Sequence, residues 1–390
     1  MPLQTKAISS SDFFERVPSS IVSDIKNVMM FLGEQYGAKC YLVGGAVRDR
    51  LLGRTCEDYD IECYGISPED FEIAMEGLGA EGVGKSFFVY KYLNLDIALP
   101  RREKKVGVGH RGFDVTLASD EEEASKRRDF TINALMYDIE NEQILDFWHG
   151  LDDLHNKVLR VVDKESFIED SLRVLRAMQF AARFGLKVER ESCLLCQNIS
   201  LSDLPKERVF LEFEKMFRGS YPHYGLYYFS ALGIAKQLFG INMDQQSFFI
   251  LSRELQRGQK NFIEELRPYY FFYIAAPYFK RGIRELLDTL GAPKIYYKKI
   301  ADVPCLPEKI DCAFVAKMAL KNGIMEFVGN YHPKIIDIAQ RLDIWEKPFG
   351  RGITPVELMA EGFSGKALGD ELARRTEEKI RSLNENCPWF

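Results

Sequence analysis

The pattern of apolar and polar positions changes character after about residue 165. Before that point, segments with the 3.6-residue period of amphipathic helices alternate with segments that have the two-residue period of strands. We predict helices and strands in alternation over 20–37 (helix), 38–43 (strand), 45–53 (helix), 58–65 (strand), 68–79 (helix) and 86–100 (strand). Beyond about Ser166 the strand pattern fades, and helical segments are separated by short Pro/Gly breaks. The chain is therefore expected to be an α+β protein, an α/β head followed by an all-helical remainder.

Length and charge narrow the class of protein. A chain of 390 residues suits two to four domains. The net charge of −6 argues against binding nucleic acid by bulk electrostatics, so any RNA contact must use local basic patches. No apolar run approaches the ~20 residues of a membrane span, and the first residues lack the apolar stretch of a signal peptide. We expect a cytoplasmic protein with no membrane partner, and no protein partner can be inferred.

Two aspartates follow a glycine pair at short spacing. In LVGGAVRDRLLGRTCEDYDIE a strand runs into Gly44-Gly45, a helix begins, and a second strand presents Asp58 and Asp60. Glycines let backbone N–H groups approach phosphate oxygens, and a helix N-terminus favours anions. Residues two apart on a strand share one face with Cα atoms ~6.6 Å apart, which suits two aspartates that share metal ions. Singly, a glycine pair is usually a turn and an Asp-x-Asp is usually surface charge, but their order and spacing favour phosphoryl-transfer chemistry.

Several segments carry a family resemblance. The text GGAVRD, LLG and DYD, followed by KRRDFTINAL at 126–135, ILDFWHGLDDL at 144–154 and EDSLRVLRAMQFAARFGL at 169–186, resembles class II tRNA nucleotidyltransferases (CCA-adding enzymes) and bacterial poly(A) polymerases. The resemblance implies a DNA polymerase β-type nucleotidyltransferase head that adds C, C and A to the tRNA 3′ end from CTP and ATP, releasing pyrophosphate. A CC-adding or A-adding enzyme, a poly(A) polymerase and a non-catalytic RNA-binding module stay open as alternatives.

The resemblance also implies a domain order. We expect a catalytic head over 1–160, a helical neck with a base-selecting helix over 161–220, a helical body over 221–290, and a helical tail over 291–390 that contacts tRNA. The tRNA is expected to bind through its 3′ end and acceptor stem. Within the body, the aromatic run over 269–279 could stack on RNA, but its apolar character favours buried helix packing.

The family's site maps onto this chain residue by residue. It implies that Asp58 and Asp60 bind catalytic Mg²⁺, a cation that prefers such hard oxygen ligands. Asp96 is the candidate for a third catalytic carboxylate, with a partly exposed strand residue as the alternative. The residues expected to bind the nucleotide are Gly44, Gly45, Arg48, Asp49, Arg128, Asp129, Asn133, Asp170, Arg173 and Arg176.

Asp170 and Arg173 are expected to select the base. Three residues apart in a helix, they would share one face. A carboxylate only accepts hydrogen bonds and a guanidinium only donates them, so Asp170 can receive the exocyclic amine of cytosine or adenine while Arg173 serves the ring nitrogen. Uracil and guanine would turn a carbonyl oxygen toward the carboxylate. A surface ion pair is the alternative interpretation.

A basic, glycine-spaced segment over 101–113 resembles the flexible loop that CCA-adding enzymes use to switch from C to A addition. Its basic residues are Arg101, Arg102, Lys104, Lys105 and Arg111. A solvated hairpin tip would have a similar sequence.

Overall fold

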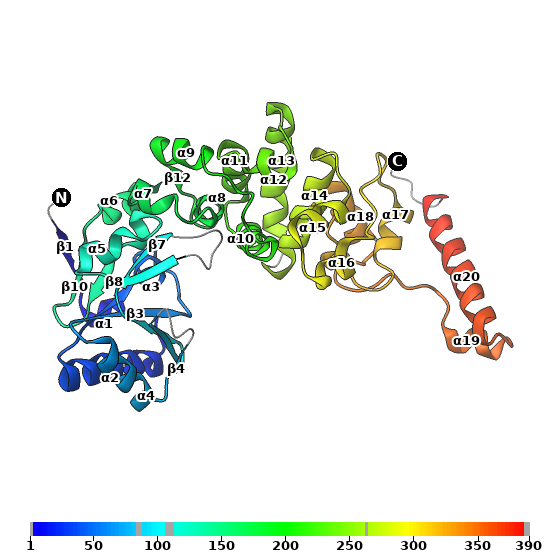
Figure 1. Cartoon of the computed structure of the whole chain (residues 1–390). Helices are drawn as coiled ribbons and strands as arrows, with labels where there is room; N and C mark the ends of the chain where they lie inside the picture. Colours follow the sequence, from blue (N-terminus) through cyan, green and yellow to red (C-terminus); the bar gives the residue numbers. More distant parts are fainter. Residues whose placement is uncertain (1–2, 83–87, 106–112, 262–263, 386–390) are drawn as a thin grey trace. The chain divides into compact units, whose positions relative to one another are not determined.

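The computed structural model describes residues 3–82, 88–105, 113–261 and 264–385 (Figure 1). The chain divides into two compact units, each described by itself below. The first contains Met1–Ala181, Gly185–Leu204 and Ala231–Gln237, and the second contains Ala182–Phe184, Pro205–Ser230 and Leu238–Phe390. The four-part division into head, neck, body and tail stays a prediction.

The head is built on a mixed, eight-stranded sheet with the strand order β1-β10-β9-β2-β3-β6-β5-β4. Neighbouring strands are antiparallel except β3 and β6, which are parallel. The strands of the first unit are β1 (Gln4–Ala7), β2 (Lys39–Val43), β3 (Tyr59–Tyr64), β4 (Glu81–Gly82), β5 (Val89–Tyr92), β6 (Leu95–Ala98), β7 (Arg101–Lys105), β8 (Phe113–Leu117), β9 (Met136–Asp138), β10 (Gln143–Asp146), β11 (Val158–Leu159) and β12 (Lys187–Val188). Its helices up to α9 are α1 (Ser10–Phe13), α2 (Ser19–Tyr36), α3 (Gly45–Leu51), α4 (Pro68–Leu78), α5 (Glu121–Lys126), the 3₁₀ turn η1 (Thr131–Asn133), α6 (Gly150–His155), α7 (Lys164–Phe167), α8 (Leu172–Phe184) and α9 (Arg190–Gln197).

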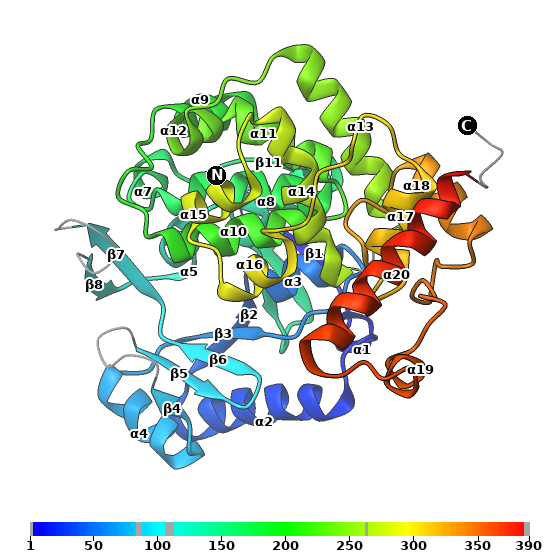
Figure 2. The same ribbon diagram turned by 90° about the vertical axis from the view of Figure 1, so that its right-hand side faces the viewer.

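The two faces of the sheet have different roles. Helices α2 and α4 lie along one face (Figure 2), where Ile25, Leu32 and Phe71 pack against Ile61 of β3 in the main core. Because side chains alternate along a strand, Asp60, Glu62 and Tyr64 of β3 point to the opposite face. Polar groups of the central strand are thereby collected on the face that these two helices leave open.

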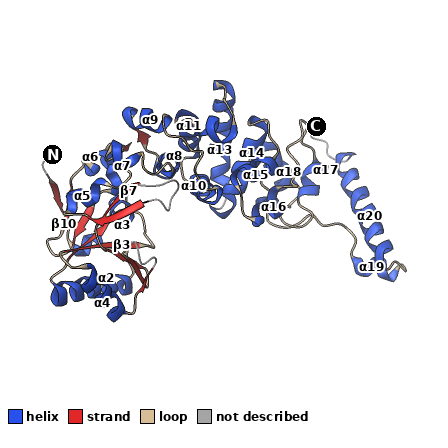
Figure 3. Cartoon of the chain, in the orientation of Figure 1, coloured by secondary structure: helices blue, strands red, loops and turns tan. Residues whose placement is uncertain are grey.

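The helical remainder follows α9. Figure 3 shows strands giving way to helices along the chain. These elements are α10 (Lys206–Arg218), α11 (Pro222–Ala231), α12 (Ile234–Phe239), α13 (Gln245–Asn261), η2 (Glu264–Leu266), α14 (Arg267–Tyr278), α15 (Ile283–Leu290), α16 (Lys294–Ile300), α17 (Cys312–Met318), η3 (Ile324–Glu326), α18 (Pro333–Arg341), α19 (Pro355–Ala360) and α20 (Gly365–Glu385). The aromatic run of α14 is buried, and Phe271 stacks on Phe217 with ring centroids 4.1 Å apart. As expected, the aromatic side chains of α14 pack in the helical core. Among the described helices, none combines the length and apolar character needed to cross a membrane.

The predicted α+β class and the helical remainder are confirmed, and the differences are local. The N-cap of α4 is Ser67, whose side chain accepts from the Asp70 amide, and the N-cap of α2 is Pro18. The single strand expected over 86–100 is, in its described part, the hairpin β5–β6. The short β12 interrupts the helical text and pairs with β11 in parallel.

Candidate active site

Two carboxylates meet on neighbouring strands. Asp60 of β3 and Asp96 of β6 are direct Cα partners in the parallel ladder. Their side chains therefore lie on the same face of the sheet, on strands about 4.8 Å apart. Asp58 lies one residue before β3 and is exposed, so the expectation that it shares a regular strand with Asp60 is wrong in this detail. Asp60 and Asp96 therefore form an acidic pair on adjacent strands, and Asp58 lies at the edge of this pair, just before β3 begins.

The charges around Asp60 favour a cation. Burial, together with the negative charges of Asp96, Glu62 and Asp58, raises the pKa of Asp60 above its ordinary value, although Arg128 opposes the shift. Within the described part of the chain, no three His, Cys, Asp or Glu side chains converge closely enough to make a ready metal cage. Carboxylate oxygens are nevertheless the ligands that hard divalent cations prefer, and a cation would relieve the repulsion at Asp60. The donor set fits such an ion.

Gly44 brings Arg128 close to this pair. It has φ = 70° and ψ = −126°, a conformation that non-glycine residues rarely adopt. A Cβ atom at Gly44 would lie 3.1 Å from Nη1 of Arg128 and 3.5 Å from Oδ2 of Asp60. The glycine is thus required by its backbone and by the narrow space that it leaves between a guanidinium and a carboxylate.

Glu62 is a site residue that sequence reasoning missed. Its Oε1 accepts hydrogen bonds from Nη2 of Arg127 at 2.9 Å and from Nη2 of Arg128 at 2.6 Å, and its Oε2 accepts one from the Tyr64 hydroxyl at 3.0 Å. The side chain is 2% exposed. Burial alone would raise the pKa of Glu62, but Arg128 and Arg127 outweigh it and hold that pKa below its ordinary value. The two-residue spacing from Asp60 is the signal that could have identified Glu62.

Asp129 is the centre of a second polar network. Its Oδ2 accepts from Nε of Arg176 at 2.6 Å and its Oδ1 from Nδ2 of Asn133 at 2.8 Å, while Oδ1 of Asn133 accepts from Nη1 of Arg48 at 2.6 Å. Arg48 also pairs with Asp49 at 2.8 Å. Burial would raise the pKa of Asp129, but Arg176 and Asn133 outweigh it and hold that pKa below its ordinary value. Five of the predicted nucleotide-binding residues, from α3, the segment 129–133 and α8, are therefore brought together.

One aromatic ring supports both ends of this network. The guanidinium carbons of Arg48 and Arg176 each lie 5.1 Å from the centroid of the Phe180 ring. Cations are attracted to the face of an aromatic ring, so Phe180 helps to hold the two arginines in place.

Asp170 and Arg173 are arranged differently from the expectation. Helix α8 begins at Leu172 with Ser171 as its N-cap, so Asp170 precedes the helix and the two residues do not share a helix face. Oδ1 of Asp170 accepts from the Leu172 amide at 3.1 Å. The guanidinium of Arg173 donates to the carbonyl oxygens of Ser166 at 2.8 Å and Arg127 at 2.7 Å. The premise about the helix is wrong, whereas the role in base selection stays a prediction.

The basic segment expected to be a flexible loop is partly a hairpin. Arg101, Arg102, Lys104 and Lys105 lie on β7, which pairs in antiparallel register with β8. Arg111 lies outside the described residues. The role of this segment in switching nucleotides stays a prediction.

The comparisons with known proteins agree with this geometry. Residues 40–160 match the model of the poly A polymerase head domain, and residues 194–241 match a probable RNA and SrmB-binding site of polymerase A. This part of the chain is therefore similar to the poly A polymerase head domain. Similarity to this head domain implies catalysis with a divalent metal ion, and the matched residues 40–160 contain every acidic residue discussed above except Asp170.

Relatives and solved structures extend the likeness. The chain is 40% identical over 212 residues to the Multifunctional CCA protein of Pasteurella multocida, covering 52% of this chain and 49% of that protein. It thus spans about half the length of this curated relative. The Thermotoga maritima CCA-adding enzyme complexed with tRNA has a TM-score of 0.69 at 24% identity, covering 99% of this chain and 96% of that one. The Bacillus stearothermophilus CCA-adding enzyme in complex with CTP has a TM-score of 0.64 at 21% identity, covering 92% and 93%. At such identities these two structures establish a shared fold.

Proposed function

We propose that the chain is a template-independent tRNA nucleotidyltransferase that adds C, C and A to the tRNA 3′ end from CTP and ATP, with Mg²⁺ as its metal ion. One observation carries this proposal: Asp60 and Asp96 lie side by side, next to Arg128 and the Gly44 turn, in a poly A polymerase head. A CC-adding or A-adding enzyme and a poly(A) polymerase would use the same head.

The proposed reaction is an in-line displacement at phosphorus. The RNA 3′ hydroxyl releases its proton to solvent as its oxygen forms a bond to the α-phosphorus of the nucleotide, the bond from that phosphorus to the bridging oxygen breaks, and pyrophosphate leaves. Asp60 and Asp96, with Asp58 at the edge, would hold Mg²⁺, which when bound stabilises negative charge on the transferring phosphate. Arg128 would face the phosphates from the Gly44 turn. Positioning and charge stabilisation supply most of the catalysis in such reactions.

Base selection is proposed for Asp170 and Arg173. The carbonyl oxygens of Ser166 and Arg127 orient the Arg173 guanidinium, so it is positioned before any nucleotide arrives. A guanidinium has five N–H groups, and contacts with Ser166 and Arg127 use at most three of them. Donors therefore remain for a ring nitrogen, while Asp170 offers a carboxylate oxygen to the amine.

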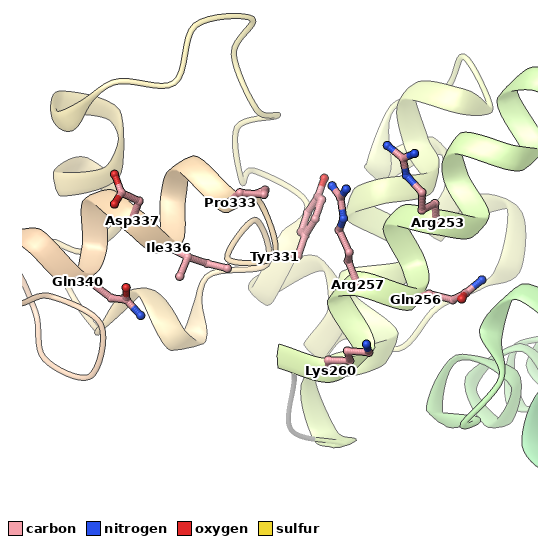
Figure 4. A pocket seen from close by; sticks show the side chains of 9 residues that line it. All are labelled: Arg253, Gln256, Arg257, Lys260, Tyr331, Pro333, Ile336, Asp337 and Gln340. Atoms are coloured by element: carbon pink, nitrogen blue, oxygen red, sulfur yellow. The ribbon is translucent and has the colours of Figure 1, made fainter. Parts of the chain in front are cut away.

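A basic pocket in the second unit supports RNA binding by residues outside the head domain. It has a volume of about 540 Å³ and lies between α13 and α18 (Figure 4). Arg253, Arg257 and Lys260 line its α13 side, at the i, i+4 and i+7 spacing of one helix face. No ion pair with a described residue holds these three cations, whereas Asp337 on the α18 side pairs with Arg341 at 2.9 Å. Phosphate groups suit such a surface.

Aromatic packing builds this pocket. Gly258 faces the Tyr270 ring so closely that an added Cβ atom would overlap it, at 1.5 Å from Cζ. The Tyr270 ring in turn contacts the ring of Tyr331, which lines the pocket, with centroids 5.2 Å apart. The α13 helix is therefore held against the segment leading into α18.

Replacing the three basic side chains of this pocket with alanine should weaken tRNA binding and make that binding less dependent on salt concentration. For the Arg253→Ala/Arg257→Ala/Lys260→Ala variant, we expect the slope of log affinity against log salt to fall by about one for each phosphate group that is no longer neutralised. Fluorescence anisotropy with labelled tRNA over a salt series measures this slope. Arg284→Ala is the matched control, because this exposed arginine of α15 pairs with Asp302 in the same unit. A triple variant with the slope of the unchanged chain would remove the pocket from the RNA interface.

A direct assay tests the proposed activity. A tRNA transcript that lacks CCA should be extended by the purified chain only when CTP is supplied first, and chelation of divalent ions should stop the extension. Extension by all four nucleotides without preference, or no extension at any divalent ion concentration, would contradict the proposal.

A further inference from the structure

Glu62 is placed between the two arginines of the KRRD motif and the acidic face of the sheet. It follows Asp60 by two residues on β3, so both carboxylates project from the same face of one strand. Its single carboxylate contacts two guanidinium groups, those of Arg127 and Arg128, through the same oxygen. Glu62 therefore links both arginines of the motif to the strand that carries Asp60.

Arg128 has two acidic neighbours. Its Nη2 lies 2.6 Å from Oε1 of Glu62, while its Nη1 borders the same narrow space beside Gly44 as Oδ2 of Asp60. Asp60 and Arg128 also attract each other, since each charge shifts the pKa of the other group toward its ionised form. A guanidinium attracted fully to Asp60 would occupy the oxygen that a divalent cation needs. The hydrogen bond to Glu62 holds the Arg128 guanidinium away from this Asp60 oxygen.

We propose that Glu62 is a positioning residue that holds Arg128, and with it Arg127, so that Asp60 stays available to a divalent cation and Nη1 of Arg128 faces the Gly44 turn. The proposal rests on the metal role of Asp60 in the proposed function. Glu62 itself touches neither metal nor nucleotide in this arrangement. Its effect passes through the arginine.

Neutralising Glu62 should weaken metal binding. In Glu62→Gln the shape of the side chain is kept, but its negative charge is lost, so Asp60 becomes the strongest anion near Arg128. The two arginines also repel an incoming cation more strongly. Because charges a few ångströms apart interact strongly inside a protein, we expect an affinity for Mn²⁺ at least about tenfold lower, which corresponds to about 1.4 kcal/mol.

Direct binding of Mn²⁺ tests this without relying on turnover. The probe is Mn²⁺ alone, titrated into the metal-free full chain, with free Mn²⁺ followed by electron paramagnetic resonance. Glu62→Asp should keep part of the affinity. Glu121→Gln is the matched control, because Glu121 accepts the Tyr41 hydroxyl at 2.8 Å and lies near Lys39 rather than the two arginines.

A second substitution separates positioning from general damage. Adding Arg128→Gln to Glu62→Gln removes the competing guanidinium, so Mn²⁺ affinity should return to within about threefold of the unchanged chain. The KM for CTP should be raised in this double variant, because Arg128 no longer faces the phosphates. Additive loss in the double variant would overturn the proposal, since a merely structural role predicts further damage. If Glu62→Gln does not fold, Arg128→Gln alone must bind Mn²⁺ more tightly than the unchanged chain, and equal or weaker binding would overturn it.

The same titration distinguishes two failures. If Asp60→Ala binds Mn²⁺ as well as the unchanged chain, the metal site of the proposed function is wrong. If Asp60→Ala loses binding while Glu62→Gln keeps it, only the positioning role of Glu62 is wrong.

Discussion

Asp60→Ala is expected to abolish nucleotide transfer while leaving tRNA binding within about twofold of the unchanged chain. Asp60 is paired with Asp96 across two central strands, and a carboxylate that helps to hold a metal ion contributes several kcal/mol of transition-state stabilisation. Each 1.36 kcal/mol corresponds to a tenfold change in rate, so the loss should exceed about a thousandfold. Single-turnover incorporation of CTP into a transcript without CCA measures it. RNA affinity, by contrast, should depend on basic groups elsewhere in the chain.

The control for this variant is another aspartate of the first unit. Asp24→Ala, on α2, should retain full transfer activity. Asp58→Ala should also lose transfer, although Asp58 is exposed and lies just before β3. Turnover like that of the unchanged chain in Asp60→Ala would mean that this aspartate is not a metal ligand.

Asp170→Ala is expected to lose nucleotide selectivity. It removes the acceptor proposed to receive the exocyclic amine of cytosine or adenine, so uracil and guanine should be incorporated measurably. Sites built to hydrogen-bond their substrate discriminate by about 10⁴ or more, so the change should be large in a four-nucleotide competition. Arg173→Ala should reduce the use of both CTP and ATP.

The same competition can refute base selection by protein side chains. If Asp170→Ala slows all nucleotides equally and keeps the preference for C and A, the Asp170 carboxylate would act only locally, through its bond to the Leu172 amide at the start of α8. Asp203→Ala is a useful comparison, because Asp203 accepts a hydrogen bond from the neighbouring Ser171 hydroxyl at 2.8 Å.

Strong periodicity made the head predictable. The helix over 20–37 and the strand that ends at Val43 have clear apolar patterns, and the structure contains both as α2 and β2. Local turn chemistry was harder to predict. The apolar text of 86–100 gave no sign of the turn between β5 and β6, where Leu93 adopts a positive φ of 53° that disfavours a bulky residue.

The site was predictable where residues are close in sequence and less so where contacts are distant. Asp60 and the KRRD arginines follow from motifs, but the bond between Glu62 and Arg128 joins residues 66 positions apart. A charged residue in a strand is normally exposed, so the burial of Glu62 was not expected, although its two-residue spacing from Asp60 places it on the same face of the strand. Asp170 was placed in a helix because the segment over 169–186 resembles the family's base-selecting helix, whereas the helix begins after Ser171.

The most direct test of the proposed function uses three tRNA transcripts that end before CCA, after the first C and after the second C. Each is incubated with the chain, a divalent ion and one labelled nucleotide at a time. For full CCA addition, we expect CTP to extend the first transcript by two residues and the second by one, and ATP to extend only the third, by one. ATP addition to the first transcript, a poly(A) ladder, or failure to add A to the third would contradict full CCA addition.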